Sequence, residues 1–422
     1  MNLAKPKNDN YAGVVTSVKS IVALKGRDFI VALPLFGHQA IVQKGWEPGD
    51  LGVFFPAEVQ LSEEYARENN MYRHEHLNKD VTEKGYLEDN RRVKAIKLGG
   101  HRSNAIFMPL SSLEFADVHA HDLKEGDTFD TINGVEICRK YEVATKQPNN
   151  QAPKLRDDRV DAKLFPEHID TGNYWRMEHT IEPDDYLYVT QKLHGTSIRI
   201  GRTLAKRKLS LRDRFGRFIG AQIQETEYAN VYGSRRVIKN ADGPDSNKFN
   251  HFYETDIWSI KGKELDGLIP DGFLVYGELI GWTPSGEAIQ TGYTYNVPKG
   301  EAELYVYRVA QVNPQGVVTD LSWPQTLEFC RNLGLNPVPT LWQGYAEEFD
   351  VDIWMNRRYA DTAPFHTHPV PMTPGKLVDE GVVVRIDGLT PRLLKAKSPD
   401  FLEHETKQLD TGVVDLESAE AA

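Results

Sequence analysis

The chain has 422 residues, of which 40% are hydrophobic and 26% are charged, as in a folded globular protein with room for two or three domains. The formal net charge of −11 argues against binding of nucleic acid through overall charge, so any nucleic-acid surface must be a local basic patch. Two cysteines, Cys138 and Cys330, are too few for a disulfide framework, and no segment has the apolar length of a membrane span or the apolar core of a signal peptide. We therefore expect a cytoplasmic protein without a membrane partner.

Short strand-like runs separated by glycine, proline and aspartate turns dominate the first part of the chain. The runs are 13–17, 29–33, 39–43 and 51–55. Short strands at regular spacing predict a small barrel or sandwich. One helix is predicted near residues 62–70, with Ser62 as its N-cap.

Cations follow these runs, where Arg92, Lys94 and Lys97 are interleaved with apolar residues. On a strand such a pattern projects positive charge onto one face. A phosphate contact and an ordinary solvated strand face explain the pattern equally well.

A polar stretch punctuated by prolines, from about 144 to 161, predicts an interdomain linker. Beyond it, strands and helices mix without the βαβα rhythm or the phosphate-binding glycine-rich sequence of doubly wound nucleotide folds. The end of the chain is acidic and rich in small residues, which predicts a frayed tail. We expect residues 1–150 to form a first domain, residues 151–405 a second one, and residues 406–422 the tail.

One lysine, Lys192, stands at the end of a strand-like run and is followed by Leu193, His194 and Gly195. The strand pattern resumes at 196–200, so the intervening residues predict a tight turn. A lysine held at the end of a buried strand beside a glycine can be approached closely by a phosphate, and burial with neighbouring cations favours the neutral, nucleophilic amine. The ordinary alternative is an exposed lysine in a hairpin, because most lysines are exposed.

Later segments supply the partners that an amine attacking a phosphoanhydride needs. They are Arg235 beside Arg236 at a strand-like turn, Glu278 in the apolar run 273–281, Glu380 before the apolar run 381–385, and Lys395 and Lys397 on one face of a strand. Cations neutralise the α-phosphate as charge develops, and carboxylates bind Mg²⁺ and ribose hydroxyls. Each feature alone has a structural explanation, such as lysines that guard an edge strand, but their joint occurrence in this order favours chemistry.

The ordered set resembles the covalent nucleotidyltransferase superfamily of DNA ligases, RNA ligases and mRNA capping enzymes. Lys192, His194 and Gly195 have the Lys-x-His-Gly form of one RNA-ligase branch. The resemblance covers about residues 160–402, and the N-terminal region resembles the OB domain of the Deinococcus-type RNA ligases. It implies an α+β protein, with an N-terminal OB-like β-barrel followed by a nucleotidyltransferase (adenylyltransferase) domain of antiparallel sheets flanked by helices.

The resemblance also implies the roles of single residues. Lys192 would be the nucleophile that accepts AMP, assisted by Lys395 and Lys397, and Glu380 would be the carboxylate near the metal. The nucleotide would be bound by Gln191 through its side-chain oxygen on the adenine amino group, by His194 and Gly195 of the lysine motif, by Arg235 or Arg236 on ribose or phosphate, by Glu278 on the ribose, by Tyr307 stacked on adenine, and by Lys395 and Lys397 on the α-phosphate. Gln191 replaces the glutamate usual in this branch, and Arg308 replaces a more usual acidic residue, which leaves the register at Tyr307 open.

We therefore expect an ATP-dependent RNA ligase that uses Mg²⁺ or Mn²⁺ and seals 3′-hydroxyl and 5′-phosphate ends through lysyl-AMP and AMP-polynucleotide intermediates, in RNA repair. The expected partner is RNA, as a nick or break with an RNA 3′-hydroxyl end, and the expected oligomeric state is a monomer. A GTP-dependent capping guanylyltransferase and an inactive RNA-binding protein with this fold are the alternatives. Residues 212–217 stay open as a basic loop that contacts either RNA or solvent. His366 and His368 are two potential metal ligands, but no further cysteine or histidine cluster accompanies them, and their proline-rich surroundings indicate a loop.

Overall fold

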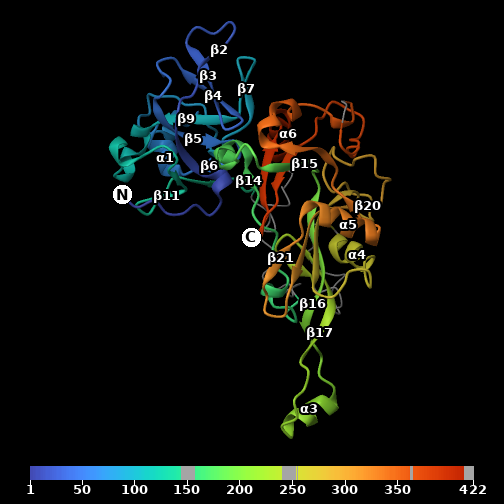
Figure 1. Cartoon of the computed structure of the whole chain (residues 1–422). Coiled ribbons are helices and arrows are strands. Elements are labelled where there is room, and N and C mark those ends of the chain that lie inside the picture. Colours follow the sequence, from blue (N-terminus) through green and yellow to red (C-terminus); the bar gives the residue numbers. More distant parts are fainter. Residues whose placement is uncertain (144–156, 240–252, 254, 362–364, 413–422) are drawn as a thin grey trace. The chain divides into compact units, whose positions relative to one another are not determined.

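The computed structural model describes residues 1–143, 157–239, 253, 255–361 and 365–412, which form two compact units (Figure 1). Within the described residues, the first unit comprises 1–143, 172–180 and 396–412, and the second unit comprises most of 157–395 apart from 172–180. The predicted division treats each domain as one continuous stretch, whereas the first unit is assembled from three separate stretches. Most of the predicted linker, and the tail beyond residue 412, lie outside the described residues.

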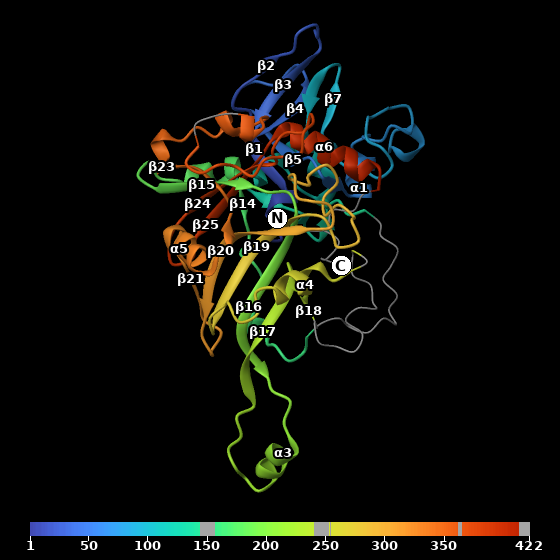
Figure 2. The same cartoon turned by 90° about the vertical axis from the view of Figure 1, so that its right-hand side faces the viewer.

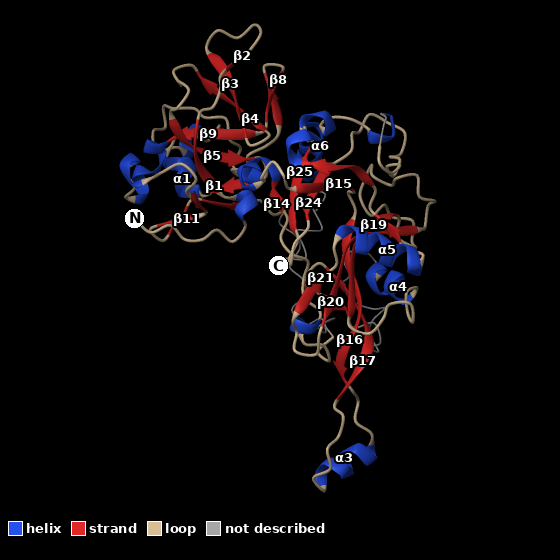
Figure 3. Ribbon diagram, in the orientation of Figure 1, coloured by secondary structure: helices blue, strands red, loops and turns tan. Residues whose placement is uncertain are grey.

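The first unit is built around a seven-stranded sheet (Figure 3). In spatial order its strands are β10 (Thr128–Phe129), β1 (Gly13–Ser17), β5 (Leu51–Pro56), β9 (Ala105–Pro109), β4 (His38–Gln43), β3 (Ile30–Leu35) and β2 (Val22–Ala23), and β4 and β9 are parallel. Two-stranded ladders join β11 (Thr131–Ile132) to β12 (Val135–Glu136), β13 (Cys138–Lys140) to β6 (Val59–Leu61), and β7 (Ile96–Leu98) to β8 (His101–Ser103). The four strand-like runs of the N-terminal region are confirmed as β1, β3, β4 and β5.

The described residues of the first unit contain three α-helices. The predicted helix is confirmed as α1 (Glu63–Glu68), which begins at Ser62 because the serine hydroxyl accepts a hydrogen bond from the Tyr65 N–H. The stretches beyond residue 143 add β14 (Gly172–Asn173), α2 (Tyr174–Met177) and α6 (Pro399–Asp410). Residues 406–410, which are predicted to belong to the tail, therefore lie in a helix.

A closed β-barrel is not found among the described strands of this unit. The seven-stranded sheet has two ends, β10 and β2, and no ladder joins them in the part of the chain that the structure describes. Regular pairing also stops at Ser17, the end of β1, and resumes at Val22, the start of β2. The predicted barrel is thus observed as an interrupted sheet.

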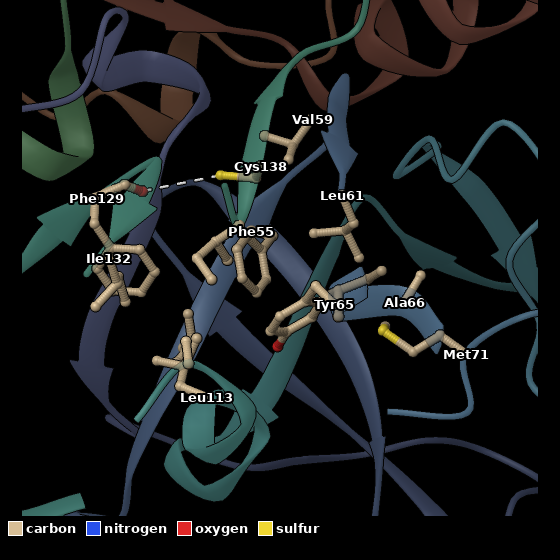
Figure 4. Packing of buried hydrophobic residues seen from close by; sticks show 14 of the residues in the cluster. Phe55, Val59, Leu61, Tyr65, Ala66, Met71, Leu113, Phe129, Ile132 and Cys138 are labelled. Carbon is tan, nitrogen blue, oxygen red and sulfur yellow. Dashed lines mark hydrogen bonds between the residues drawn. The ribbon is translucent and has the colours of Figure 1, made fainter. Parts of the chain in front are cut away.

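Aromatic and aliphatic side chains fill the core beneath this sheet (Figure 4). The rings of Phe55 and Tyr65 pack edge to face with their centroids 5.3 Å apart. The Cys138 thiol donates to the Phe129 carbonyl oxygen at 3.9 Å and forms no disulfide, and Cys330 of the second unit is likewise a free, buried thiol. Apolar burial, and not a disulfide, therefore stabilises this unit.

The interleaved cations of the first unit do not form an open basic face. The Arg92 guanidinium is buried, and its Nε lies 2.8 Å from Glu58 Oε2. The Lys94 ammonium lies 2.9 Å from a carboxylate oxygen of Asp410 in α6. Acidic residues of the same unit therefore neutralise these cations, and the structure favours a stabilising role over the phosphate contact considered from the sequence.

The second unit contains two sheets, which are antiparallel apart from one short strand. One sheet places β25 (Arg392–Lys397), β24 (Gly381–Ile386), β15 (Tyr186–Lys192) and β23 (Thr340–Tyr345) side by side in this order. The other has the order β18 (Ile238–Lys239), β17 (Thr226–Ser234), β16 (Thr196–Lys206), β19 (Phe273–Gly281), β20 (Ala302–Val312) and β21 (Val318–Asp320), with β22 (Asn336–Pro337) parallel to β20. Helix α4 (Ile257–Lys263) packs on β16 and β17, and α5 (Trp323–Leu333) packs on β20 (Figure 2). The α+β class with antiparallel sheets is confirmed.

Helix α5 shows how local sequence sets the ends of an element. The Ser322 hydroxyl accepts from the Gln325 N–H, and the Gln325 side chain accepts from the Ser322 N–H, which satisfies two otherwise unpaired donors. Gly334 ends the helix with a φ of 67°, a conformation that glycine adopts without strain. Trp323 and Cys330 are buried on the face that meets the sheet. In the described part of the chain, no helix has both the length and the apolar character needed to cross a membrane.

Candidate active site

The pairing of β15 with β24 brings Lys192 next to a carboxylate. Lys192 ends β15 opposite Gly381, the first residue of β24, so Glu380 lies beside the lysine. The Lys192 Nζ is 2.8 Å from Glu380 Oε1, and His194 Nδ1 is 3.5 Å from Glu380 Oε2. The Glu380 side chain is only 2% exposed, and the lysine side chain 18%. Because a buried carboxylate is stable only with a positively charged or hydrogen-bonding partner, the ion pair with Lys192 stabilises Glu380 in its buried position.

Lys192 lies at a cavity that is open to solvent and lined by both polar and apolar side chains. Five other predicted positions line the same cavity, namely Gln191, Arg235, Glu278, Tyr307 and Lys395. The lining is completed by His168, Thr171, Thr190, Leu193, Ser197, Trp323, Val338, Val383, Arg385 and Leu393. All these residues belong to the second unit.

The turn after Lys192 lies so close to β19 that position 195 has room only for a glycine. A methyl group at this position would lie 2.1 Å from the carbonyl oxygen of Leu279, because the turn is pressed against β19. The Gly195 N–H also donates to Glu278 Oε1 at 3.0 Å, which fixes that carboxylate at the cavity. The structure therefore explains the glycine by the close approach of two backbone segments, whereas the sequence suggested the approach of a phosphate.

The loop between β19 and β20 holds the same turn from another side. The Tyr295 hydroxyl accepts from the His194 N–H at 2.7 Å, and Gln290 Nε2 donates to the Gly195 carbonyl oxygen at 2.8 Å. The ring of Tyr293 packs edge-on against the His194 ring, with centroids 5.0 Å apart. Sequence reasoning missed these residues, because they lie about a hundred positions beyond Lys192 and form no motif with it.

The side chain of Gln191 is bound to the protein through both of its polar atoms. Its oxygen accepts from the Val370 N–H at 2.7 Å, and its nitrogen donates to Asp379 Oδ1 at 2.7 Å. The other Asp379 oxygen accepts from the Tyr359 N–H at 2.8 Å. Gln191 therefore positions the segment that precedes Glu380, and only the second lone pair of its oxygen is left for the predicted adenine contact.

The stability of the protein should depend on the ionisation of Asp379. Burial raises the pKa of this carboxyl from 3.8 to about 6, so the native state binds the proton more tightly than the unfolded state does. The ionised form therefore costs stability above about pH 6, and this cost disappears as the pH falls to about 4. We expect the free energy of unfolding of the wild type, relative to Asp379→Asn, to rise by about 2 kcal/mol as the pH is lowered from 6 to 4, as measured by urea unfolding. A difference that does not vary with pH would contradict the prediction.

A β-bulge settles the register at Tyr307. Consecutive residues of β19 pair with Arg308 and Val306, so that Tyr307 is the extra residue of β20. Its side chain lines the cavity, and its hydroxyl lies 2.8 Å from Ser197 Oγ. Arg308 is buried in an ion pair with Asp320 at 2.5 Å, so the arginine that departs from the expected pattern has a structural role.

The structure distinguishes between neighbouring cations that the sequence left equivalent. Arg235 lines the cavity, whereas Arg236 is exposed and is not among the lining residues. Lys395 also lines the cavity, whereas the Lys397 ammonium donates to Glu405 Oε1 at 3.0 Å. The geometry therefore favours Arg235 and Lys395 as cations that face a bound anion.

Arg385 is a further cation of the cavity that sequence reasoning missed. Its Nε donates to Asp387 Oδ1 at 2.7 Å, and its guanidinium lies 5.7 Å from the ring centre of Trp323. The signal was present in the sequence, because Arg385 is the one charged side chain within the apolar strand β24.

The described residues contain no group of three or more histidine, cysteine, aspartate and glutamate side chains that could hold a metal ion. His366 and His368 thus belong to no such group in the described part of the chain, in agreement with the loop expected from the sequence. A cation at this cavity would rely on Glu380 together with ligands from a substrate.

Comparison with known proteins identifies the family. A sequence model described as RNA ligase matches residues 185–397, about half of the chain. The chain belongs to the RNA ligase family. The match contains the lysine turn, β19, β24 and β25, and thus the principal residues of the cavity. RNA ligases of this kind are members of the nucleotidyltransferase superfamily.

Solved structures of the Naegleria gruberi RNA ligase share the fold of this ligase. The structure with PPi has a TM-score of 0.59 at 16% identity, and the match covers 94% of this chain and 98% of that chain. The structure of a mutant with ATP and Mn has a TM-score of 0.57 at 16% identity, and the match covers 94% of this chain and 98% of that chain. The structure of a mutant with AMP and Mn has a TM-score of 0.58 at 16% identity, and the match covers 93% of this chain and 98% of that chain. A comparison with curated proteins gives no match.

Proposed function

We propose that this RNA ligase seals RNA ends in three steps and consumes ATP. The observation that carries the proposal is the 2.8 Å contact between Lys192 Nζ and the buried Glu380, at a cavity that Arg235 and Lys395 also line. Among the solved Naegleria gruberi ligase structures that share the fold, one is a complex with ATP and Mn and another a complex with AMP and Mn, and this supports the same ligands here.

In the first step, Lys192 Nζ attacks the α-phosphorus of ATP. A nitrogen–phosphorus bond forms, the bond from this phosphorus to pyrophosphate breaks, and pyrophosphate leaves. The amine must lose a proton before it attacks, and Glu380 Oε1 is within reach to accept it. Arg235 and Lys395 neutralise the charge that develops on the phosphate oxygens.

In the second step, an oxygen of an RNA 5′-phosphate attacks the phosphorus of lysyl-AMP, the nitrogen–phosphorus bond breaks, and Lys192 regains a proton. In the third step, an RNA 3′-hydroxyl attacks the activated 5′-phosphate, a phosphodiester bond forms, and AMP leaves. The hydroxyl proton passes to solvent. One ATP is thus converted to AMP and pyrophosphate for each bond that is sealed.

The remaining cavity residues bind the nucleotide in this proposal. Tyr307 stacks on adenine, since the bulge in β20 aims its ring into the cavity. Glu278, held by the Gly195 N–H, accepts hydrogen bonds from the ribose. Lys397, which is predicted from the motif to contact the α-phosphate, would have to exchange its contact with Glu405 for one with the nucleotide.

The residues present fit a divalent cation that is shared with the substrate. The described residues offer no cluster of three ligands, whereas Glu380 is a buried carboxylate beside the reactive lysine. Mg²⁺ is commonly held by one or two carboxylates together with phosphate oxygens, and Mn²⁺ suits the same oxygen ligands. Such an ion would neutralise charge on the phosphates, and Glu380 is the residue that we expect to hold it.

The first unit is proposed to be an OB-like domain that binds nucleic acid. In support, β1 pairs with β5, whereas β2, a few residues further along, pairs with β3 at the other end of the sheet. The interrupted strand thus places β1 beside β10 near one end of the sheet and β2 at the other end, as expected of a partly open barrel. OB folds bind single strands in a groove. Ultraviolet crosslinking of RNA to the full chain should label peptides from residues 1–143, and labels confined to the second unit would contradict the proposal.

Replacing Gly195 by alanine should displace the turn that carries Lys192. A contact of 2.1 Å with a backbone oxygen cannot be relieved by rotation of a side chain. Since a misplacement of about 1 Å costs on the order of 10²-fold in rate, we expect the AMP adduct to form on the order of 10²-fold more slowly in single-turnover kinetics. Gly375→Ala is the matched control, because a methyl group there meets nothing within 4 Å. Equal rates for the two variants would show that the contact is relieved.

A labelling and sealing experiment tests the proposed reaction. The protein is incubated with radiolabelled ATP or GTP and a divalent cation, then with nicked duplexes that carry RNA or DNA on each side of the nick. We expect labelling from ATP and sealing of nicks with an RNA 3′-hydroxyl. Labelling from GTP alone would indicate a capping-type guanylyltransferase, and a folded protein labelled by neither nucleotide would indicate an inactive RNA-binding protein.

We further propose that the protein is a monomer in the reducing cytoplasm, where the free thiols of Cys138 and Cys330 would persist.

A further inference from the structure

An arm, residues 206–225, connects β16 to β17 and contains α3 (Leu211–Phe218) (Figure 1). A capping box begins the helix, because the Ser210 hydroxyl accepts from the Asp213 N–H and the Asp213 carboxylate accepts from the Ser210 N–H. Figures 1 and 2, viewed at right angles, both show α3 standing apart from the other elements of the second unit. The arm is therefore a projecting feature of this unit.

One face of α3 exposes large apolar side chains. Leu211 is 83% exposed, Phe215 65%, Phe218 87% and Ile219 63%. Their spacing of four, three and one residues places them on one side of the helix. Gly216, on a different side, lies close to Ile223 of the arm itself. A contiguous exposed apolar stripe on a globular protein indicates a binding surface.

The arm is also strongly basic. Residues 206–225 contain six lysine and arginine residues and two carboxylates, in a chain whose net charge is −11. Both carboxylates are paired within the arm, since Asp213 lies 2.9 Å from Arg207, and a Glu225 oxygen lies 3.3 Å from Arg217. At about 100° per residue, Arg212 and Arg214 flank the apolar stripe, and both are exposed. The excess positive charge favours a polyanionic partner.

We propose that α3 binds the polynucleotide substrate at a distance from Lys192, a role that rests on the proposed ligase function. Phe215 and Phe218 stack on unpaired bases, and Arg212 and Arg214 contact backbone phosphates. Aromatic stacking beside cations is how proteins hold single-stranded RNA. A protein partner would cover the apolar stripe but would also have to supply acidic groups on both sides of it, whereas RNA satisfies the rings and the cations with one ligand.

The length of β16 sets how far the arm reaches. The strand has 11 residues, from Thr196 beside the lysine turn to Lys206 at the base of the arm. At about 3.3 Å per residue it spans about 35 Å. At about 3.4 Å per base step, a polynucleotide covers this distance in on the order of ten nucleotides. Contact with α3 therefore requires a substrate that extends at least that far from the joint.

The test compares two arm variants on substrates of two lengths. The variants are Phe215→Ala with Phe218→Ala, and Arg212→Gln with Arg214→Gln. Exposed residues of the same unit supply the matched controls Leu389→Ala and Arg331→Gln. Each RNA substrate carries an unpaired extension of about 6 or about 20 nucleotides beyond the joint, and these lengths lie below and above the reach of α3. Binding is measured by fluorescence anisotropy, sealing by steady-state kinetics, and AMP-adduct formation without RNA by intact mass.

We expect both arm variants to weaken binding of the long RNA, and to raise its KM for sealing, by roughly 10-fold. Binding of the short RNA, adduct formation and kcat should match the controls. Unchanged binding of the long RNA, or equal weakening for both lengths, would overturn the proposal. So would a wild-type dimer in light scattering that the phenylalanine variant dissociates, because a second copy would then cover the stripe. If the wild type forms no AMP adduct, the ligase function fails, and the anisotropy comparison still decides whether the arm binds RNA.

Discussion

Replacing Lys192 by alanine is expected to abolish the AMP adduct and to reduce the sealing of ordinary RNA ends by on the order of 10⁴-fold or more. The reason is that in the proposed mechanism the bond to AMP forms at Lys192 Nζ, which lies 2.8 Å from Glu380 Oε1. Intact mass after incubation with ATP and Mg²⁺ reports the adduct, and gel analysis of nicked RNA reports sealing.

Two comparisons distinguish the loss of the nucleophile from a loss of folding in Lys192→Ala. Lys192→Arg keeps a cation beside Glu380 but provides no amine of comparable nucleophilicity, so it should also lack the adduct. RNA that already carries AMP on its 5′-phosphate bypasses the first two steps, and we expect both variants to seal it. An adduct in either variant would refute Lys192 as the nucleophile, and failure on adenylylated RNA would point to misfolding.

Substitution of Glu380 by glutamine should have the next largest effect. Glutamine preserves the shape of a side chain that is 2% exposed, but it neither accepts the proton of Lys192 nor holds a divalent cation well. Removing one such electrostatic group commonly costs on the order of 10²- to 10³-fold in rate, and we expect adduct formation to slow by this factor. Single-turnover labelling with ATP measures the effect.

The two roles of Glu380 can be separated in the same variant. If Glu380 accepts the proton, higher pH should restore part of the rate of Glu380→Gln, and if it holds the cation, higher Mg²⁺ or Mn²⁺ should restore it. Breaking a buried ion pair can also cost about 3–5 kcal/mol of stability, so urea unfolding must accompany the kinetics. Glu328→Gln, at an exposed pair on α5, is the control for loss of one carboxylate. A folded Glu380→Gln with the wild-type rate would remove Glu380 from the chemistry.

The residues of the site were largely predictable from the sequence because their signals are local. A charged side chain within or beside an apolar run is conspicuous, and Glu278, Glu380 and Lys395 were found in this way. Arg385 carried the same signal and was overlooked. The alternation of side chains along a strand also predicts which residues share a face.

Local sequence patterns did not predict the register in which neighbouring strands pair. Tyr307 enters the cavity because the β19–β20 ladder contains a bulge, and Arg308 is diverted to Asp320. Arg235 and Arg236 are equivalent in the sequence, yet only Arg235 lines the cavity. A shift of one residue exchanges the two faces of a strand, so these choices depend on how neighbouring strands are paired.

The sequence by itself determined the α+β class, most strands around the site, the turn that follows Lys192 and the basic character of residues 212–217. Only the tertiary structure decided why Gly195 is needed, how Tyr295 and Gln290 hold the turn, and that α3 presents its phenylalanines to solvent. The physical reason is the range of the interactions. Periodicity, turn residues and charge act over a few neighbouring positions, whereas the His194–Tyr295 hydrogen bond joins residues 101 positions apart. Such contacts exist only once strands from distant parts of the chain have been aligned.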